Sequence, residues 1–272
     1  MSTLQALLLG IIQGFTEFLP ISSSGHLAII QHYMGIKGPV IFFDVLLHGG
    51  TLAAVVVFFR KELYLIIISI IRFNCPDERL TSERHIVLAI IIGTIPTAFL
   101  GVVFYKVKDI FFQSSIIPAA MLLFTGIFLW VGEKYSVSRP HSKQKINFID
   151  ALFIGIMQGV ALIPGVSRSG TTISSGLIRG LDRELSFRYS FLLFIPAVIG
   201  ALLLENKTSI PLPSDNFTLP YTAGTLTAFI TGIVALALLK KILQNRSLVI
   251  FSWYCWGLGG GLILWETIKA IL

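Results

Sequence analysis

Long apolar runs separated by short polar connections dominate this chain. The runs cover about residues 43–59, 86–105, 114–132, 187–204, 220–239 and 248–265. Each can cross a bilayer as a helix, a conformation that satisfies the backbone hydrogen bonds within the segment. The apolar stretch 62–73 is too short to cross, and we expect it to lie along the interface. The pattern predicts an all-α polytopic membrane protein with about six transmembrane helices.

Two further apolar segments are interrupted near their middles. Residues 3–35 contain the sequence FLPISSSGH, and residues 148–180 contain IPGVSRSGT. Proline and clusters of serine and glycine end one helix and allow another to start. Irregular backbone at membrane depth is tolerated only where protein or a wet cavity surrounds it. We therefore expect two re-entrant helix hairpins within a single integral membrane domain, residues 1–272.

The two interrupted segments resemble each other at an offset of 145 residues. GIIQGFTEFLPISSSG, residues 10–25, aligns without gaps with GIMQGVALIPGVSRSG, residues 155–170, and seven of the sixteen positions are identical. Three predicted spans, an odd number, lie between the hairpins. The halves, about 1–135 and 148–272, should therefore have inverted topology, with the two breaks meeting near the midplane.

The aligned breaks differ in chemistry. Glu17 aligns with Leu162, Ser23 with Arg168, and His26 with Thr171. The first half thus supplies an acid and an imidazole, and the second half supplies a guanidinium. A symmetric scaffold is predicted to have a chemically asymmetric centre.

Composition and charge support the membrane interpretation. Hydrophobic residues make up 54% of the chain and charged residues 13%, with a mean hydropathy of +0.83. Such a chain is not a cytosolic enzyme, a disordered protein or a disulfide scaffold. We attribute the net charge of +7 to membrane orientation rather than to a nucleic acid partner. The sequence leaves a homodimer open.

The basic residues also predict an orientation. Of the 21 Lys and Arg residues, 15 fall on one side of the predicted spans and Arg168 lies in the second break. The other side holds Lys37, Lys106, Lys108, Lys207 and Lys269. The side with 15 is expected to be cytoplasmic, so both termini and the first hairpin belong to the outer side.

A carboxylate stands out in the first hairpin. Gln13 and Glu17 are four residues apart and share one helix face. An intramembrane carboxylate is costly and needs a partner. Arg168 is the first candidate, and a metal ion or a substrate phosphate is the alternative. A Glu17–Arg168 pair that only locks the hairpins together remains a third interpretation.

The serines at the breaks predict helix N-termini that face one another. The serines are Ser22, Ser23, Ser24, Ser167 and Ser169. Two N-termini concentrate free N–H groups and positive dipole ends, and Arg168 adds a planar fork that suits phosphate oxygens. His26, beside the first break, is a candidate acid, base or nucleophile. Asp44 and His48 form a second pair four residues apart, and Asp44 is expected to bind a cation or to orient His26.

The two breaks also carry a family resemblance. QGFTEFLPISSSGH, residues 13–26, and PGVSRSGTT, residues 164–172, resemble the signature motifs of the undecaprenyl-diphosphate phosphatase family, the BacA-type bacitracin resistance proteins. The matching positions are Gln13, Glu17, Pro20, Ser22, Ser23, Gly25, His26, Pro164, Gly165, Ser167, Arg168, Ser169 and Thr172. The residue at position 13 is Gln, where some members have Glu, which weakens any scheme with two carboxylates on this helix.

The resemblance implies a phosphoric anhydride hydrolase. Such an enzyme converts undecaprenyl diphosphate into undecaprenyl phosphate and inorganic phosphate, and so recycles the lipid carrier of cell-wall synthesis. The resemblance also implies Mg²⁺ or Ca²⁺ and a site on the outer face of the plasma membrane. A transporter or flippase of a phosphorylated lipid, using the same anion site, is the alternative.

We assign roles to the matching residues on this basis. The expected catalytic residues are Glu17, His26, Ser23 and Arg168. The expected substrate-binding residues are Gln13, Ser22, Ser24, Gly25, Gly165, Ser167, Ser169 and Thr172, and the expected metal ligands are Glu17, Gln13 and Asp44. Ser23 assisted by His26 is our favoured nucleophile, with His26 itself or an activated water as the alternatives.

Overall fold

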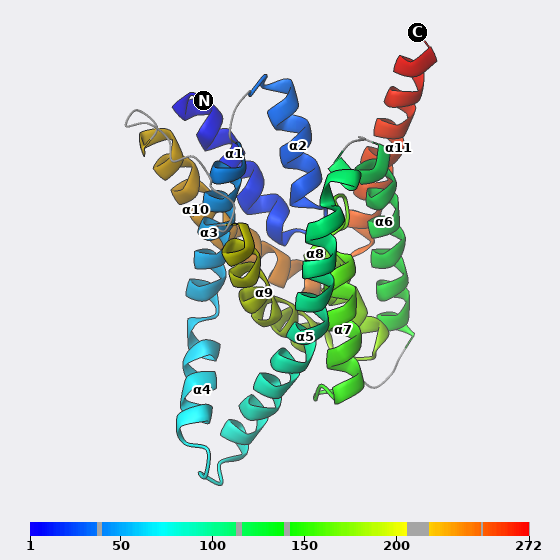
Figure 1. Cartoon of the computed structure of the whole chain (residues 1–272). Coiled ribbons are helices and arrows are strands. Elements are labelled where there is room, and N and C mark those ends of the chain that lie inside the picture. The colour runs from blue at the N-terminus through cyan, green and yellow to red at the C-terminus, as the bar shows by residue number, and fades with distance from the viewer. Residues whose placement is uncertain (37–39, 113–115, 139–141, 206–217, 246, 272) are drawn as a thin grey trace.

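The computed structural model describes residues 1–36, 40–112, 116–138, 142–205, 218–245 and 247–271. Within these residues the chain is all-helical, apart from one isolated bridge between Lys143 and Leu181 (Figure 1). The helices are α1 Thr3–Phe18, α2 Ser23–Tyr33, α3 Val40–Phe58, α4 Arg60–Ile71, α5 Glu78–Phe112, α6 Ile116–Val137, α7 Phe148–Val160, α8 Arg168–Ile178, α9 Arg183–Glu205, α10 Thr218–Asn245 and α11 Val249–Ile271. The all-α prediction is confirmed.

Four of these helices are long and apolar enough to cross a membrane. The qualifying stretches are Glu78–Val107, Ile116–Val137, Arg183–Leu204 and Leu219–Gln244. The apolar stretches Phe42–Phe58 and Phe148–Val160 are shorter. Many large apolar side chains on the long helices are exposed, as expected of surfaces that face lipid. The protein is therefore a polytopic membrane protein.

Both predicted helix breaks are present. α1 ends at Phe18 and α2 begins at Ser23, while α7 ends at Val160 and α8 begins at Arg168. α2 and α8 have 11 residues each, so each is only about 16 Å long at 1.5 Å per residue, roughly half of a hydrocarbon core. The breaks therefore lie where the proline and serine clusters predicted them.

The stretch 62–73 corresponds closely to α4. This helix follows α3 after Phe59 and continues in a similar direction, and it packs against α5 (Figure 1). Its expected position along an interface stays a prediction. Of the basic residues used for orientation, Lys37, Arg139, Lys207 and Arg246 lie outside the described residues.

Corresponding helices of the two halves make corresponding contacts. α1 packs along α10 from the other half, and α7 packs along α5. Glycines permit both contacts, since a Cβ on Gly10 would lie 2.4 Å from the carbonyl oxygen of Gly224 and a Cβ on Gly155 would lie 2.2 Å from that of Gly93. Gly10 and Gly155 are matched positions of the internal repeat. Small residues let helix backbones approach closely in membranes, so the repeat preserves a packing contact.

The chain ends and one connection lie at opposite ends of the bundle. Figure 1 shows the N-terminus and the C-terminus at the same end, and the α4–α5 connection at the other. Phe18, at the end of α1, packs edge-to-face on Phe191 and Phe194 of α9. This aromatic cluster joins the first break to the second half of the chain and lies next to the polar residues described below.

Candidate active site

α1 carries the carboxylate at the centre of the site. Its N-terminus is closed by a capping box between Ser2 and Gln5. Near its other end, Gln13 Nε2 donates to Glu17 Oε2 at 3.1 Å, as the four-residue spacing predicts. Gln13 is fully buried and Glu17 is 8% exposed. A buried carboxylate needs donors from elsewhere in the chain.

The two breaks use unusual backbone geometry. Ser22 has φ +68°, in the left-handed region that non-glycine residues rarely adopt. In the second break, Gly165 has φ +93°, and a Cβ there would lie 2.1 Å from the carbonyl oxygen of Pro118. Only glycine fits this position. Both turns direct the following helix N-terminus toward Glu17.

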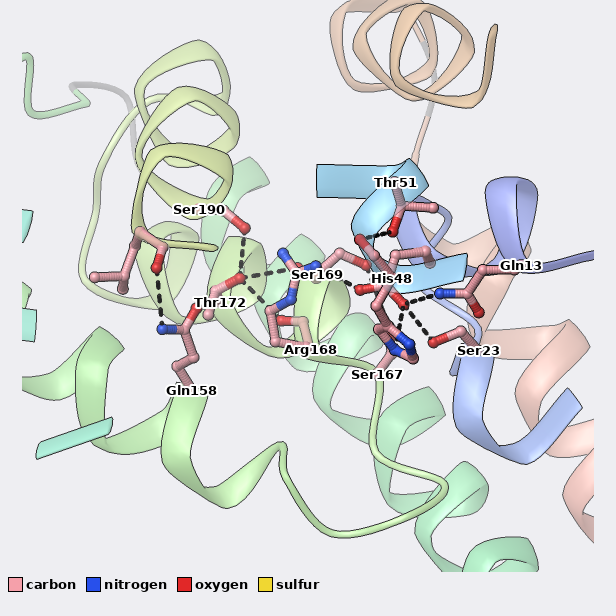
Figure 2. Close-up of polar contacts among 12 residues, drawn as sticks. Gln13, Ser23, His48, Thr51, Gln158, Ser167, Arg168, Ser169, Thr172 and Ser190 are labelled. Atoms are coloured by element: carbon pink, nitrogen blue, oxygen red, sulfur yellow. Dashed lines mark hydrogen bonds and ion pairs between the residues drawn. The ribbon is translucent and has the colours of Figure 1, made fainter. Parts of the chain in front are cut away.

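The first residue of each following helix bonds to Glu17. Ser23 Oγ, at the start of α2, donates to Glu17 Oε2 at 2.6 Å. Arg168 Nη2, at the start of α8, donates to Glu17 Oε1 at 2.8 Å, with both side chains largely buried. Figure 2 shows Gln13, Ser23 and Arg168 gathered around this point. The predicted Glu17–Arg168 pair and the convergence of the two helix N-termini are thus both present.

Arg168 is held on several sides. Its guanidinium carbon lies 3.7 Å from the ring centroid of Phe194 and 5.8 Å from that of Phe191. Its Nη1 is buried and has no hydrogen-bond partner among the described residues. A buried N–H group without a partner is uncommon. One side of the fork therefore remains available to an anion.

The hydroxyl groups around the second break mostly bond to nearby backbone and to each other. Ser167 caps α8 by accepting from the N–H of Gly170 at 3.2 Å, and its Oγ pairs with that of Ser169 at 3.3 Å. Thr172 Oγ1 donates to the carbonyl of Arg168 at 2.9 Å and also pairs with Ser190 (Figure 2). These contacts stabilise the start of α8 and hold Arg168 in place. In the first break, Ser22 Oγ pairs with Ser24 Oγ at 3.4 Å.

His48 also contacts Glu17, a position that the sequence did not predict. Glu17 and the four side chains in contact with it are called the Glu17 cluster below: Gln13, Ser23, His48 and Arg168. His48 Nε2 lies 3.7 Å from Glu17 Oε2, and Figure 2 shows its ring beside Ser23 and Gln13. Its Nδ1 is 2.8 Å from the carbonyl oxygen of Asp44. The signal in the sequence was a histidine within an apolar run, four residues after Asp44. The partner could not be found that way, since the contact between α1 and α3 is not local in sequence.

The His26 ring contacts Ser22 and Tyr254, and the Asp44 carboxylate bonds to Gln31. His26 Nδ1 faces the carbonyl of Ser22 at 2.8 Å, and its Nε2 faces the hydroxyl of Tyr254 at 2.7 Å. Asp44 Oδ1 accepts from Gln31 Nε2 at 2.7 Å. The expected roles of His26 as an assistant to Ser23 and of Asp44 as a cation ligand stay predictions.

The arrangement suits phosphoryl chemistry. A serine hydroxyl donates to a carboxylate that could accept its proton, which is the usual way to activate a weak nucleophile. A guanidinium and two helix N-termini lie beside it and could hold anionic oxygens.

Comparison with known protein families finds a match over most of the chain. Residues 6–261 match the family described as "Bacitracin resistance protein BacA".

The chain belongs to the BacA family.

Similar proteins extend along nearly the whole chain. It is 42% identical over 270 residues to the "Undecaprenyl-diphosphatase" of Desulforapulum autotrophicum, covering 95% of this chain and 96% of the relative. It is 38% identical over 276 residues to the protein of that name from Alkaliphilus metalliredigens, covering 98% and 100%. A third, from Methanobrevibacter smithii, is 38% identical over 268 residues, covering 95% and 96%. The family resemblance in the two breaks is confirmed.

The fit of a divalent cation can be tested on the side chains of the site. Among the described residues, no three His, Cys, Asp or Glu side chains form a group that could hold a metal ion. However, Gln13 Oε1 is buried without a partner in the described structure, next to Glu17. One carboxylate and one amide oxygen suit a cation that takes its remaining ligands from substrate phosphates and water. Gln13 and Glu17 are therefore the residues that could hold such a cation, beside the Ser23 and Arg168 groups that already contact the two Glu17 oxygens.

Proposed function

We propose that this BacA-family protein hydrolyses the phosphoanhydride bond of undecaprenyl diphosphate, and that the groups around Glu17 perform the reaction. Near full-length similarity to undecaprenyl-diphosphatases supports the activity. The observation that carries the assignment is the 2.6 Å contact from Ser23 Oγ to Glu17, whose other oxygen is held by Arg168. Nucleophile, base and anion-binding group thus lie at one point.

Ser23 is the nucleophile in this scheme. Its hydroxyl proton passes to Glu17 Oε2 while Oγ attacks the terminal phosphorus. The bond from that phosphorus to the bridging oxygen breaks, and undecaprenyl phosphate leaves with the bridging oxygen. Glu17 then passes its proton to the departing undecaprenyl phosphate. Water cleaves the phosphoserine by attacking its phosphorus, and one water proton goes to Ser23 Oγ, which releases inorganic phosphate and restores the Ser23 hydroxyl and the Glu17 carboxylate. The short contact to Glu17 favours Ser23 over His26, whose described contacts are to Ser22 and Tyr254.

Arg168 and the helix N-termini bind the phosphates. The free Nη1 of Arg168 can donate to a phosphate oxygen while Nη2 stays on Glu17. Positioning and charge stabilisation supply most of the catalysis in phosphoryl transfer. In the proposal the serines, the glycines and one threonine of the two breaks also contribute to the phosphate site: Ser22, Ser24, Gly25, Gly165, Ser167, Ser169 and Thr172.

Mg²⁺ or Ca²⁺ is the proposed cofactor, with Glu17 and Gln13 as its protein ligands and Asp44 as a further candidate. A bound divalent cation would neutralise charge on the phosphate oxygens. The support is the orphaned Gln13 Oε1 beside the carboxylate.

The two helix pairs are proposed to be re-entrant hairpins of an inverted repeat, with repeats of about 1–135 and 148–272 and six membrane-crossing helices. Three features support this architecture. α2 and α8 are too short to cross, the halves make matched contacts through Gly10 and Gly155, and Ser23 and Arg168 are equivalent positions. The bias of basic residues supports a site open to the outer face of the plasma membrane.

Purified protein in detergent tests the proposal. We expect phosphate release from a soluble prenyl diphosphate without any membrane gradient, which a transporter or flippase would not show. Glu17→Gln should reduce kcat by at least about 100-fold, within the range for a lost general base. Glu184→Gln is the matched control, because Glu184 is an exposed carboxylate paired with Lys240. If Glu17→Gln keeps the rate of that control, the site assignment is wrong.

A further inference from the structure

The imidazole of His26 is clamped between the first break and a helix of the other half. Its Nδ1 is 2.8 Å from the carbonyl oxygen of Ser22, and its Nε2 is 2.7 Å from the hydroxyl of Tyr254 on α11. The two rings are also stacked, with centroids 5.8 Å apart and an interplanar angle of 12°. Both ring nitrogens and one ring face of His26 are thus engaged.

The partners of the two ring nitrogens determine which nitrogen of His26 carries the hydrogen. A carbonyl oxygen can only accept, so the hydrogen of the neutral ring lies on Nδ1. Nε2 is then an acceptor, and the Tyr254 hydroxyl is its donor. The Ser22 carbonyl therefore sets the tautomer of His26, and the Tyr254 hydroxyl holds that ring in place by donating to Nε2.

Ser22 needs such support because of its backbone. A non-glycine residue at φ +68° persists only where its surroundings hold it there. The Ser22 carbonyl accepts from His26 Nδ1 and, at 3.4 Å, from the His26 backbone N–H. The next residue of α11, Cys255, approaches the carbonyl of Pro20 with its Sγ at 3.7 Å. Two successive α11 residues thus support the same turn.

The turn determines where the proposed nucleophile lies. Ser23 directly follows Ser22, and its Oγ reaches Glu17 Oε2 at 2.6 Å. A rotation of the Ser22 peptide would move Ser23 away from the carboxylate. The contacts form an unbroken series from Tyr254 through His26 and Ser22 to Ser23.

We propose that Tyr254 is a positioning residue of the hydrolysis, which acts through His26 and the Ser22 carbonyl to keep the Ser23 hydroxyl on Glu17. This inference rests on the proposed function of the Glu17 cluster. It gives α11, at the far end of the sequence, a role in aligning a site built from α1, α2 and α8. It also gives His26 a role in holding the turn rather than in accepting a proton.

The experiment compares single and double variants in detergent with a soluble prenyl diphosphate. Tyr254→Phe removes only the hydroxyl and keeps the stacked ring. We expect kcat to fall about tenfold with KM within about twofold, a size typical of coupled neighbours. Tyr64→Phe makes the same chemical change on an exposed tyrosine of α4 and should leave both constants unchanged.

A double-mutant cycle tests the route of the effect. In a His26→Gln background, Tyr254→Phe should cause little further loss, because its only proposed connection to Ser23 is already gone. Independent losses that multiply in the double variant would overturn the proposal, as would unchanged kcat in Tyr254→Phe.

Nuclear magnetic resonance of ¹⁵N-histidine-labelled protein separates this inference from the proposed function. Tyr254→Phe should shift the Nε2 resonance of His26, which is assigned by its loss in His26→Gln, and Tyr64→Phe should not. An unshifted resonance overturns the clamp whatever the activity. If Glu17→Gln is fully active while the resonance shifts and the cycle shows coupling, the proposed base is wrong and the role of Tyr254 stands.

Discussion

Ser23 and Arg168 occupy equivalent positions in the two halves, and they donate to opposite oxygens of the same carboxylate. Each is the first residue of the second helix in its pair, 145 positions apart, with contacts to Glu17 of 2.6 and 2.8 Å. In other words, one architectural position provides a hydroxyl in one half and a cation in the other. Glu17 itself has no counterpart, because Leu162 occupies the matching place.

Arg168 is expected to contribute both charge and shape. Arg168→Ala leaves a buried carboxylate without its cation, a change that typically costs about 3–5 kcal/mol. Arg168→Lys should restore much of that stability, yet kcat/KM should stay at least about tenfold below wild type, since an ammonium cannot bridge Glu17 and a phosphate as a planar fork does. Thermal unfolding in detergent and phosphate release measure the two effects.

The control for this change lies elsewhere in the bundle. Arg179 pairs with the buried Asp150 through its Nε at 2.8 Å. Arg179→Lys should affect stability without a selective loss of kcat/KM. Equal kcat/KM in Arg168→Lys and wild type would contradict the proposed role of the fork.

The stability of the fold should depend on the two glycine contacts between the halves, at Gly10 and at Gly155, because neither leaves room for a side chain. A methyl group on Gly155 or on Gly10 would meet backbone carbonyl oxygen at 2.2 or 2.4 Å. We expect each Ala substitution to destabilise the fold by about 1–3 kcal/mol, the usual range for overpacking. Gly200→Ala on α9 is the control, because no heavy atom beyond its own neighbourhood lies within 4 Å of the added Cβ. Matched stabilities of Gly155→Ala and Gly200→Ala would argue against the close helix contact.

Removal of divalent cations should abolish most of the activity. A chelator is expected to lower phosphate release, and added Mg²⁺ or Ca²⁺ should restore it. Gln13→Ala should raise the cation concentration needed for half-maximal activity by about tenfold or more, as is common when a metal's supporting polar group is lost. Gln158→Ala, at the matched position on α7, changes an amide that bonds to Thr97 and Leu193 and should not alter the cation requirement. Full activity in chelator would exclude the proposed cofactor.

A native cysteine offers a test of orientation. Cys75 lies between α4 and α5 and is partly exposed, whereas Cys255 is fully buried. If the α4–α5 connection is cytoplasmic, a membrane-impermeant maleimide should label Cys75 in inside-out vesicles and not in intact cells. Thr267→Cys in a Cys75→Ser background places a thiol near the exposed end of α11 and should show the opposite pattern. Labelling of Cys75 from outside the cell would reverse the proposed topology.

The sequence by itself determined the helices, the two breaks and the identity of the polar residues beside them. These features are local, because run length, proline and serine–glycine clusters act within a few residues of where they occur. The predicted runs match α3, α5, α6, α9, α10 and α11: they pass the end of α3 and precede the start of α11 by one residue each, and positions 114 and 115 of the third run lie outside the described residues. Both breaks lie at the expected motifs. The repeat also indicated that Glu17, Ser23 and Arg168 would meet, because equivalent breaks of an inverted repeat approach one another.

Only the tertiary structure decided which atoms pair. It placed His48 of α3 against Glu17 and directed His26 toward Tyr254 of α11. These outcomes depend on how far each helix slides and rotates against its neighbours, which is governed by contacts such as Gly10 on Gly224 and Gly155 on Gly93. Such contacts join residues more than 60 positions apart, so no local pattern in the sequence specifies them.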